Sequence, residues 1–184
     1  MKSSAFNIHI IDNFFPENVY EKILESIPNM NWSSSDLYDS KREGDHLWIS
    51  NLVHPEDEIT GILINLINEK TLFKIKQFKL LSYTLQSQTS EPYVHSDEAY
   101  GEEKGKSHSQ ILIYIDGSVD INKGTGFYVK QGDQWVLNTH VGFFKNRAIL
   151  FPTGVWHSPL TWNSKDGIPR IALIGQFDKT ILCS

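Results

Sequence analysis

The spacing of apolar residues divides the chain into two regions. In the first, an apolar run from Ile8 to Ile11 predicts a strand, and later apolar residues recur every three or four positions, which predicts helices. One helix is expected to start at Pro16 and Glu17, because proline fits a first helical turn and an acidic residue stabilises the positive end of the helix dipole. A second helix is expected over about 56–70, with a polar loop at 31–44 between the two.

After Phe73 the pattern changes to short apolar or alternating runs separated by glycine, proline and asparagine. Such spacing is typical of an all-β sandwich or barrel. Six runs are expected to be strands, namely 78–83, 110–115, 127–129, 135–137, 148–151 and 170–177. The sequence therefore predicts a mainly β fold with N-terminal helices. We expect one domain over 1–184, in which a helical part at about 1–72 packs on a jelly roll at about 73–184.

Composition narrows the functional classes. A chain of 184 residues can bury a substantial core without disulfides, and the one cysteine, Cys183, has no partner for an intrachain bridge. The net charge of −5 argues against a nucleic-acid partner, since such surfaces are usually basic. No stretch approaches the roughly 18 apolar residues that span a bilayer, and residues 1–11 lack the pattern of a secretory signal. We therefore expect no membrane partner and a cytoplasmic protein.

The pair His95 and Asp97 is the first candidate for chemistry. Residues two apart on an extended strand point to the same side, so both could reach one ion. His157 follows an apolar run that enters a proline and glycine turn, which places it at a strand end. Two imidazoles and one carboxylate can hold one face of an iron(II) ion and leave the other face open. The alternatives are a chance pair, in a chain with seven histidines, and a structural His157.

Arg170 opens an apolar strand and is one of only three arginines in the chain. A buried guanidinium without an anionic partner is costly. A forked pair of charge-assisted hydrogen bonds to a dicarboxylate cosubstrate would supply that partner. The alternative partner is a structural carboxylate in the core.

Further motifs extend these residues into a family pattern. The segment Ile10–Pro16 is a strand-to-helix opening, Ile111–Asp116 is a strand containing a tyrosine near its end, and Gly124–Phe127 is a glycine- and threonine-rich turn. With the histidines, aspartate and arginine above, this pattern resembles the iron(II)- and 2-oxoglutarate-dependent oxygenases, within them the prolyl 4-hydroxylase-like group. The resemblance covers most of the chain and implies a double-stranded β-helix, the cupin-like jelly roll.

The resemblance implies that His95, Asp97 and His157 bind iron(II) as the catalytic centre. The reaction it implies consumes 2-oxoglutarate and dioxygen, hydroxylates an unactivated C–H bond and releases succinate and carbon dioxide. Ascorbate is a candidate additional cofactor. Because Asp97 is present, we expect a hydroxylase rather than a halogenase. A peptidyl residue, an amino acid and a small metabolite all remain open as substrates.

For the cosubstrate, the resemblance implies that Arg170 pairs with the distal carboxylate of 2-oxoglutarate and that Tyr114 donates its hydroxyl to the same group. Tyr83 is a further candidate for this pocket. The group often has serine or threonine two residues after the basic residue, where this chain has Ala172. One hydroxyl donor is therefore lost, which leaves Tyr114 or a water to compensate.

Two rival functions are a cupin-like metal protein, either an isomerase or a cosubstrate-free dioxygenase, and a non-enzymatic jelly-roll binding module. The polar stretch Ser87–Ser109 is either a solvated loop or a lid that orders over substrate. Tyr93 and Tyr100 flank the His95–Asp97 pair and could contact a small-molecule or peptide substrate. Trp156 is either a wall of the substrate pocket or a residue of the core or rim.

Overall fold

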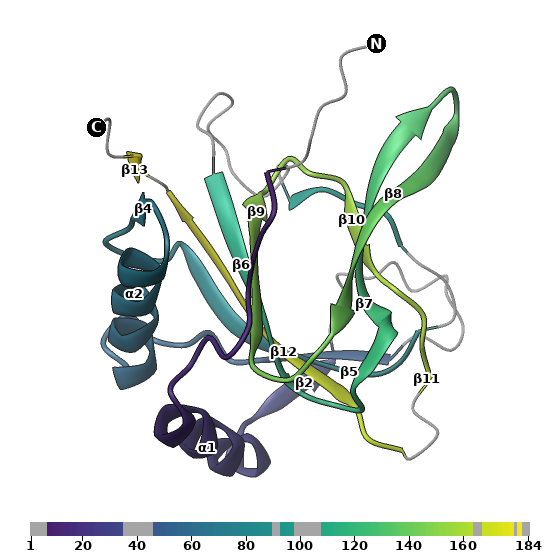
Figure 1. Ribbon diagram of the computed structural model, residues 1–184. Coiled ribbons are helices and arrows are strands. Elements are labelled where there is room, and N and C mark those ends of the chain that lie inside the picture. The colour runs from purple at the N-terminus through teal and green to yellow at the C-terminus, as the bar shows by residue number, and fades with distance from the viewer. Residues whose placement is uncertain are drawn as a thin grey trace.

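The computed structural model describes residues 7–34, 46–89, 93–97, 108–163, 167–178 and 180–181 (Figure 1). The helices are α1 (Glu17–Ser26), a 3-10 turn η1 (Ile27–Asn29) and α2 (Glu58–Lys70). The strands are β1 (His9–Ile11), β2 (Trp32–Ser34), β3 (His46–Ser50), β4 (Phe73–Lys74), β5 (Leu80–Thr89), β6 (His108–Asp116), β7 (Asp120–Gln131), β8 (Gln134–Phe143), β9 (Arg147–Pro152), β10 (His157–Pro159), β11 (Trp162–Asn163), β12 (Arg170–Asp178) and β13 (Thr180–Ile181).

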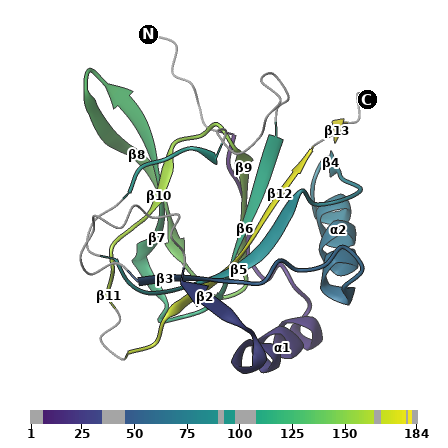
Figure 2. The same cartoon turned by 180° about the vertical axis from the view of Figure 1, so that it is seen from behind.

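Two antiparallel sheets face each other. The larger has the order β1-β9-β6-β12-β5-β3-β2, with β11 also pairing with β5, and the smaller has the order β10-β7-β8. The helices α1 and α2 cover the outer face of the larger sheet, and the smaller sheet lies on its inner side (Figures 1 and 2). This is the expected mainly β jelly roll with N-terminal helices.

Strand β6 shows how the sequence produces these layers. Its central run Ile111–Ile115 is apolar, and both faces of the strand are buried there. Ile111, Ile113 and Ile115 point into the core beneath the helices, while Leu112 and Tyr114 point into the core between the sheets. The Tyr20 hydroxyl donates to Ile115 O at 2.5 Å and so ties α1 to this strand.

The predicted boundaries hold in part. The second helix begins at Glu58 rather than at 56, after the turn in which Asp57 Oδ2 accepts from His54 N at 2.8 Å. The loop prediction for 31–44 is wrong at Trp32–Ser34, which pairs with β3 at the edge of the larger sheet. Neither strand was predicted, because both are short and β2, at the sheet edge, has only one apolar residue. Residues 35–44 of that loop, and Cys183, lie outside the described residues.

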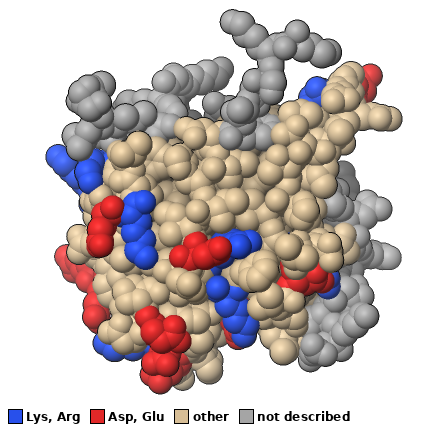
Figure 3. Space-filling view, viewed as in Figure 1, with Lys and Arg blue, Asp and Glu red and all other residues tan. Residues whose placement is uncertain are grey.

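In the part of the chain that the structure describes, no helix is long and apolar enough to cross a membrane. Acidic and basic side chains are interspersed over the lower half of the face in Figure 3.

Candidate metal centre

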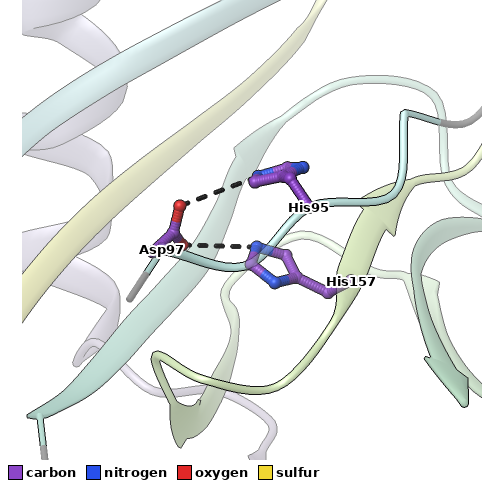
Figure 4. A group of neighbouring side chains, drawn as sticks. All are labelled: His95, Asp97 and His157. Carbon is purple, nitrogen blue, oxygen red and sulfur yellow. Dashed lines mark ion pairs between the residues drawn. The ribbon is translucent and has the colours of Figure 1, made fainter. Parts of the chain in front are cut away.

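His95 and His157 are held side by side by the backbone. His95 N donates to His157 O at 3.0 Å and His157 N donates to His95 O at 2.8 Å, as an isolated antiparallel bridge. Their ring centroids lie 4.5 Å apart. His157 opens β10, as expected for a strand end, whereas His95 lies in a short extended segment (Figure 4).

Asp97 completes the cluster. Its backbone N donates to Thr153 O at 3.0 Å, which fixes this segment against the turn after β9. One carboxylate oxygen lies 3.7 Å from His95 Nε2 and the other lies 3.4 Å from His157 Nε2 (Figure 4). One possible ligand atom from each of the three residues lies within 4.8 Å of the others. The structure therefore brings together the three side chains that the sequence analysis selected.

The hydrogen bonds of the two rings fit a metal ion. His95 Nδ1 lies 2.9 Å from Tyr93 O, and His157 Nδ1 lies 2.9 Å from Val155 O. A carbonyl oxygen only accepts, so each Nδ1 carries the hydrogen and each Nε2 presents a lone pair. Ligand atoms on adjacent corners of a metal site stand about 3 Å apart when the bonds are about 2.1 Å long. The observed separations from Asp97 are close to that value.

Burial strengthens the case for a neutral imidazole at His157. His157 is 8% exposed and packs against the rings of Phe127 and Phe151. The pKa of His157 is lowered from 6.5 to about 4, mainly by burial and in the same direction by His95, while the Asp97 carboxylate opposes the shift. A neutral ring is the form that binds a metal.

The three side chains line a cavity of about 520 Å³ between the sheets. Its lining from the larger sheet comes mostly from β5, β6 and β12, as Leu80, Ser82, Thr84, Gln86, Gln110, Leu112, Arg170, Ala172, Ile174 and Gln176. Tyr93 also lines it and stacks on His95 with ring centroids 5.4 Å apart. Among the described lining residues, Asp97 is the only carboxylate. The cavity thus joins a candidate metal centre to a surface of neutral polar and aliphatic groups with one cation.

That cation is Arg170, which is 4% exposed. Its Nη1 donates to Gly124 O at 2.8 Å and its Nη2 to Thr125 Oγ1 at 3.3 Å. The guanidinium carbon lies 5.0 Å from the ring centre of Tyr114 and 5.9 Å from that of Phe143. These contacts fix the direction of the side chain. Arg170 and the three candidate ligands thus line one cavity.

Tyr114 lies beneath Arg170 rather than in the cavity wall. Its hydroxyl donates to Thr125 Oγ1 at 2.8 Å, and Val141 O lies 3.3 Å away. Complete burial raises the pKa of Tyr114. The hydroxyl is thus engaged by Thr125, which itself lines the cavity. Direct donation from Tyr114 to a cosubstrate stays a prediction.

The placement of Tyr83 in this pocket is wrong. On β5 the residues Ser82, Thr84 and Gln86 face the cavity, so Tyr83 points to the opposite face because side chains alternate along a strand. It lines a separate groove beneath the helices, beside residues such as Ile23. Burial there raises the pKa of Tyr83 to about 12.

Sequence reasoning gave no role to several polar side chains of the cavity. Thr125 accepts hydrogen bonds from both Tyr114 and Arg170, and Gln86 and Gln110 are 5% and 2% exposed. Polar residues at 82, 84 and 86 alternate with apolar ones at 81, 83 and 85, so the pattern of β5 was visible in the sequence. The sequence did not show which face of β5 lines a cavity.

The other residues that the sequence suggested for the substrate pocket are Trp156, Tyr100 and the proposed lid. Trp156 is 40% exposed and stacks on Trp135 of β8, with ring centroids 4.3 Å apart, and it is not part of the cavity lining. It is therefore a rim residue. Of the proposed lid, residues 87–89, 93–97 and 108–109 are described, and Tyr100 lies outside them.

Comparison with solved structures identifies the fold. The chain is similar to a prolyl-4-hydroxylase from Pseudomonas putida, with 14% identity and a TM-score of 0.62 over 95% of this chain and 94% of the other. It is also similar to HygX from Streptomyces hygroscopicus with nickel and 2-oxoglutarate bound, with 11% identity and a TM-score of 0.61 over 94% and 83%.

The fold is that of the iron(II)- and 2-oxoglutarate-dependent oxygenases. A prolyl hydroxylase from Trichoplax adhaerens, in complex with a peptide fragment of the hypoxia inducible factor oxygen degradation domain, shares this oxygenase fold with 12% identity and a TM-score of 0.60 over 95% and 84%. No protein-family profile matches the sequence, and no curated protein sequence matches it significantly.

Proposed function

We propose that this protein is a non-haem iron(II)- and 2-oxoglutarate-dependent dioxygenase that hydroxylates an unactivated C–H bond, with succinate and carbon dioxide as co-products. One observation carries the proposal. His95, Asp97 and His157 converge on the same cavity that contains the buried guanidinium of Arg170. A cosubstrate-free cupin or a binding module gives no reason for both features to share one cavity.

Each residue has a defined role in this proposal. The Nε2 atoms of the two histidines and the carboxylate of Asp97 would hold iron(II). Arg170 would pair with the distal carboxylate of 2-oxoglutarate and so orient its oxo-acid end toward the metal. Iron, when bound, supplies the activation of dioxygen, which protein side chains cannot perform.

The protein's own contribution is geometry and exclusion of water. Leu112, Ala172 and Ile174 line the wall of the larger sheet between the polar groups, and their aliphatic side chains leave no competing ligands there. A dry cavity strengthens the charge-assisted bonds to Arg170. HygX was crystallised with nickel and 2-oxoglutarate, which supports a divalent metal ion and 2-oxoglutarate as ligands here.

The substrate is proposed as a peptidyl residue, an amino acid or a small metabolite. The Trichoplax enzyme was crystallised with a peptide, which supports the first of these. Tyr93, half-exposed and stacked on His95, is placed to contact a substrate at the metal centre. Screening of candidate substrates for stimulated 2-oxoglutarate turnover, with mass detection of a product heavier by one oxygen, would identify it.

The test of the proposed function is succinate formation from 2-oxoglutarate by the iron-loaded protein. We expect Asp97→Ala and His157→Ala to abolish it. Matched controls remove the same residue types elsewhere, at exposed Asp133 and exposed His140, and should keep wild-type turnover. Full turnover by either metal-centre variant would refute the assignment.

A further inference from the structure

The cavity end that contains Arg170 includes a second polar side chain, Gln86. The two residues are register partners on β12 and β5, so their side chains leave the sheet on the same face with Cβ atoms about 5 Å apart. Both line the cavity, and Gln86 is 5% exposed. Within the described chain, the carboxamide of Gln86 has no hydrogen-bond partner. Its amide therefore faces the cavity with its hydrogen-bonding groups available to a ligand.

The lack of a hydroxyl at position 172 suggests a role for the Gln86 amide as a hydrogen-bond donor. Ala172 lies two residues after Arg170 on the same face, where its methyl group cannot donate a hydrogen bond. The hydroxyl of Tyr114 already donates to Thr125, so it does not supply a free donor to the cavity. Gln86 has a neutral N–H donor, and the sheet register makes it the direct cross-strand neighbour of Arg170.

We propose that Gln86 is a cosubstrate-binding residue, whose Nε2 donates a hydrogen bond to the carboxylate that Arg170 holds. The inference rests on the proposed function. Because Ala172 has no hydroxyl, the carboxylate lacks one donor, and Gln86 would supply another. A carboxylate has about four acceptor positions, of which a forked arginine fills two. An amide fills another without adding charge to the site.

The proposed role requires a neutral side chain at position 86. A glutamate there would place a carboxylate in register with Arg170 and would form an internal ion pair with it. That ion pair would compete with the cosubstrate for the guanidinium. Gln86→Glu is therefore expected to stabilise the ligand-free protein and to exclude 2-oxoglutarate.

The experiment is calorimetric titration of oxygen-free protein loaded with manganese(II) in place of iron. The probes are 2-oxoglutarate and 2-oxobutyrate, which shares the oxo-acid end but lacks the distal carboxylate. For Gln86→Met we expect the Kd of 2-oxoglutarate to rise about tenfold, the loss of one hydrogen bond to a charged group, and that of 2-oxobutyrate to stay within twofold. Gln86→Glu should raise the Kd of 2-oxoglutarate at least a hundredfold and raise the melting temperature of the ligand-free protein.

The control is Gln134→Met, the same change at an exposed residue of β8 outside the cavity lining, which should bind both probes like the wild type. Wild-type affinity of Gln86→Met for 2-oxoglutarate would overturn the inference. So would an equal loss for both probes, since the defect would then be structural. Gln86→Leu repeats the test if the Met variant does not fold. If the wild type itself does not bind 2-oxoglutarate, the proposed function fails first, which is a distinct result.

Discussion

The imidazole rings of His95 and His157 lie 4.5 Å apart between centroids, and the backbones of the same two residues exchange both of their hydrogen bonds. The two candidate metal ligands are thus positioned by main-chain pairing. Such pairing limits the reorganisation needed when a metal binds.

Acid should destabilise the metal-free protein through His157. Its pKa falls from 6.5 to about 4 on folding, mainly because of burial, so the unfolded chain binds the proton more readily than the folded chain. Stability is therefore fully present above pH 6.5 and is lost as the pH falls from 6.5 toward 4, by roughly 1–3 kcal/mol. Urea unfolding of metal-free protein at several pH values measures this. The His157→Gln variant should show a shallower loss over that range, and an identical loss would contradict the prediction.

Removal of Arg170 should affect the cosubstrate before the metal. Arg170→Ala should raise the apparent KM for 2-oxoglutarate by one or more orders of magnitude, because a buried charge-assisted pair is worth about 2–5 kcal/mol. Steady-state kinetics with varied 2-oxoglutarate measures this. Arg147→Ala is the matched control, since Arg147 pairs with Asp12 on the surface. It should leave the KM unchanged, and an unchanged KM for Arg170→Ala would point to a different anchor.

The two tyrosines should behave differently when each loses its hydroxyl. Tyr114→Phe keeps the ring beneath Arg170 but removes the donor to Thr125, so we expect a loss of about 1 kcal/mol in stability and a several-fold rise in the Kd of 2-oxoglutarate. Tyr83→Phe should leave that Kd unchanged, because Tyr83 lies on the other face of β5. Calorimetric titration of both variants tests this, and a larger effect from Tyr83→Phe would contradict the assignment of faces.

Substitutions of Gln110 test whether its unpaired amide lowers the stability of the protein. Both amide atoms are buried in the cavity wall without a protein partner in the described structure. Gln110→Met should raise the free energy of unfolding by about 1 kcal/mol, since a methionine fills similar space without an unpaired amide. Gln110→Ala should lower it, because it leaves a cavity. Urea unfolding separates the two, and equal destabilisation would show that the amide is paired.

The sequence predicted much of the fold, because most strands combine apolar runs with clear turn residues. Strand β6 is an example, since its run Ile111–Ile115 is apolar and buried on both faces. The edge strand β2 was missed, since Trp32–Ser34 has only one apolar residue. Which face of β5 lines the cavity depends on sheet pairing, so Tyr83 was assigned to the wrong side while Gln86 was overlooked.

Some residues of the candidate site could also be predicted from the sequence, and others could not. His95, Asp97 and His157 could be selected because histidine and aspartate are chemically distinctive and their positions relative to strands are readable. Thr125 and Gln110 could not, because neutral polar residues are common and only the tertiary structure shows that they line one cavity. Chemistry of the metal centre is thus easier to predict than the lining that selects its ligands.

The central claim is that three side chains from distant parts of the chain hold one iron(II) beside an anchor for 2-oxoglutarate. Addition of 2-oxoglutarate to iron(II)-loaded protein without oxygen tests it most directly, by visible absorption spectroscopy. We expect a weak charge-transfer band for the wild type and none for His157→Ala. Absence of the band in the wild type, or an equal band in the variant, would refute the proposed iron and 2-oxoglutarate site.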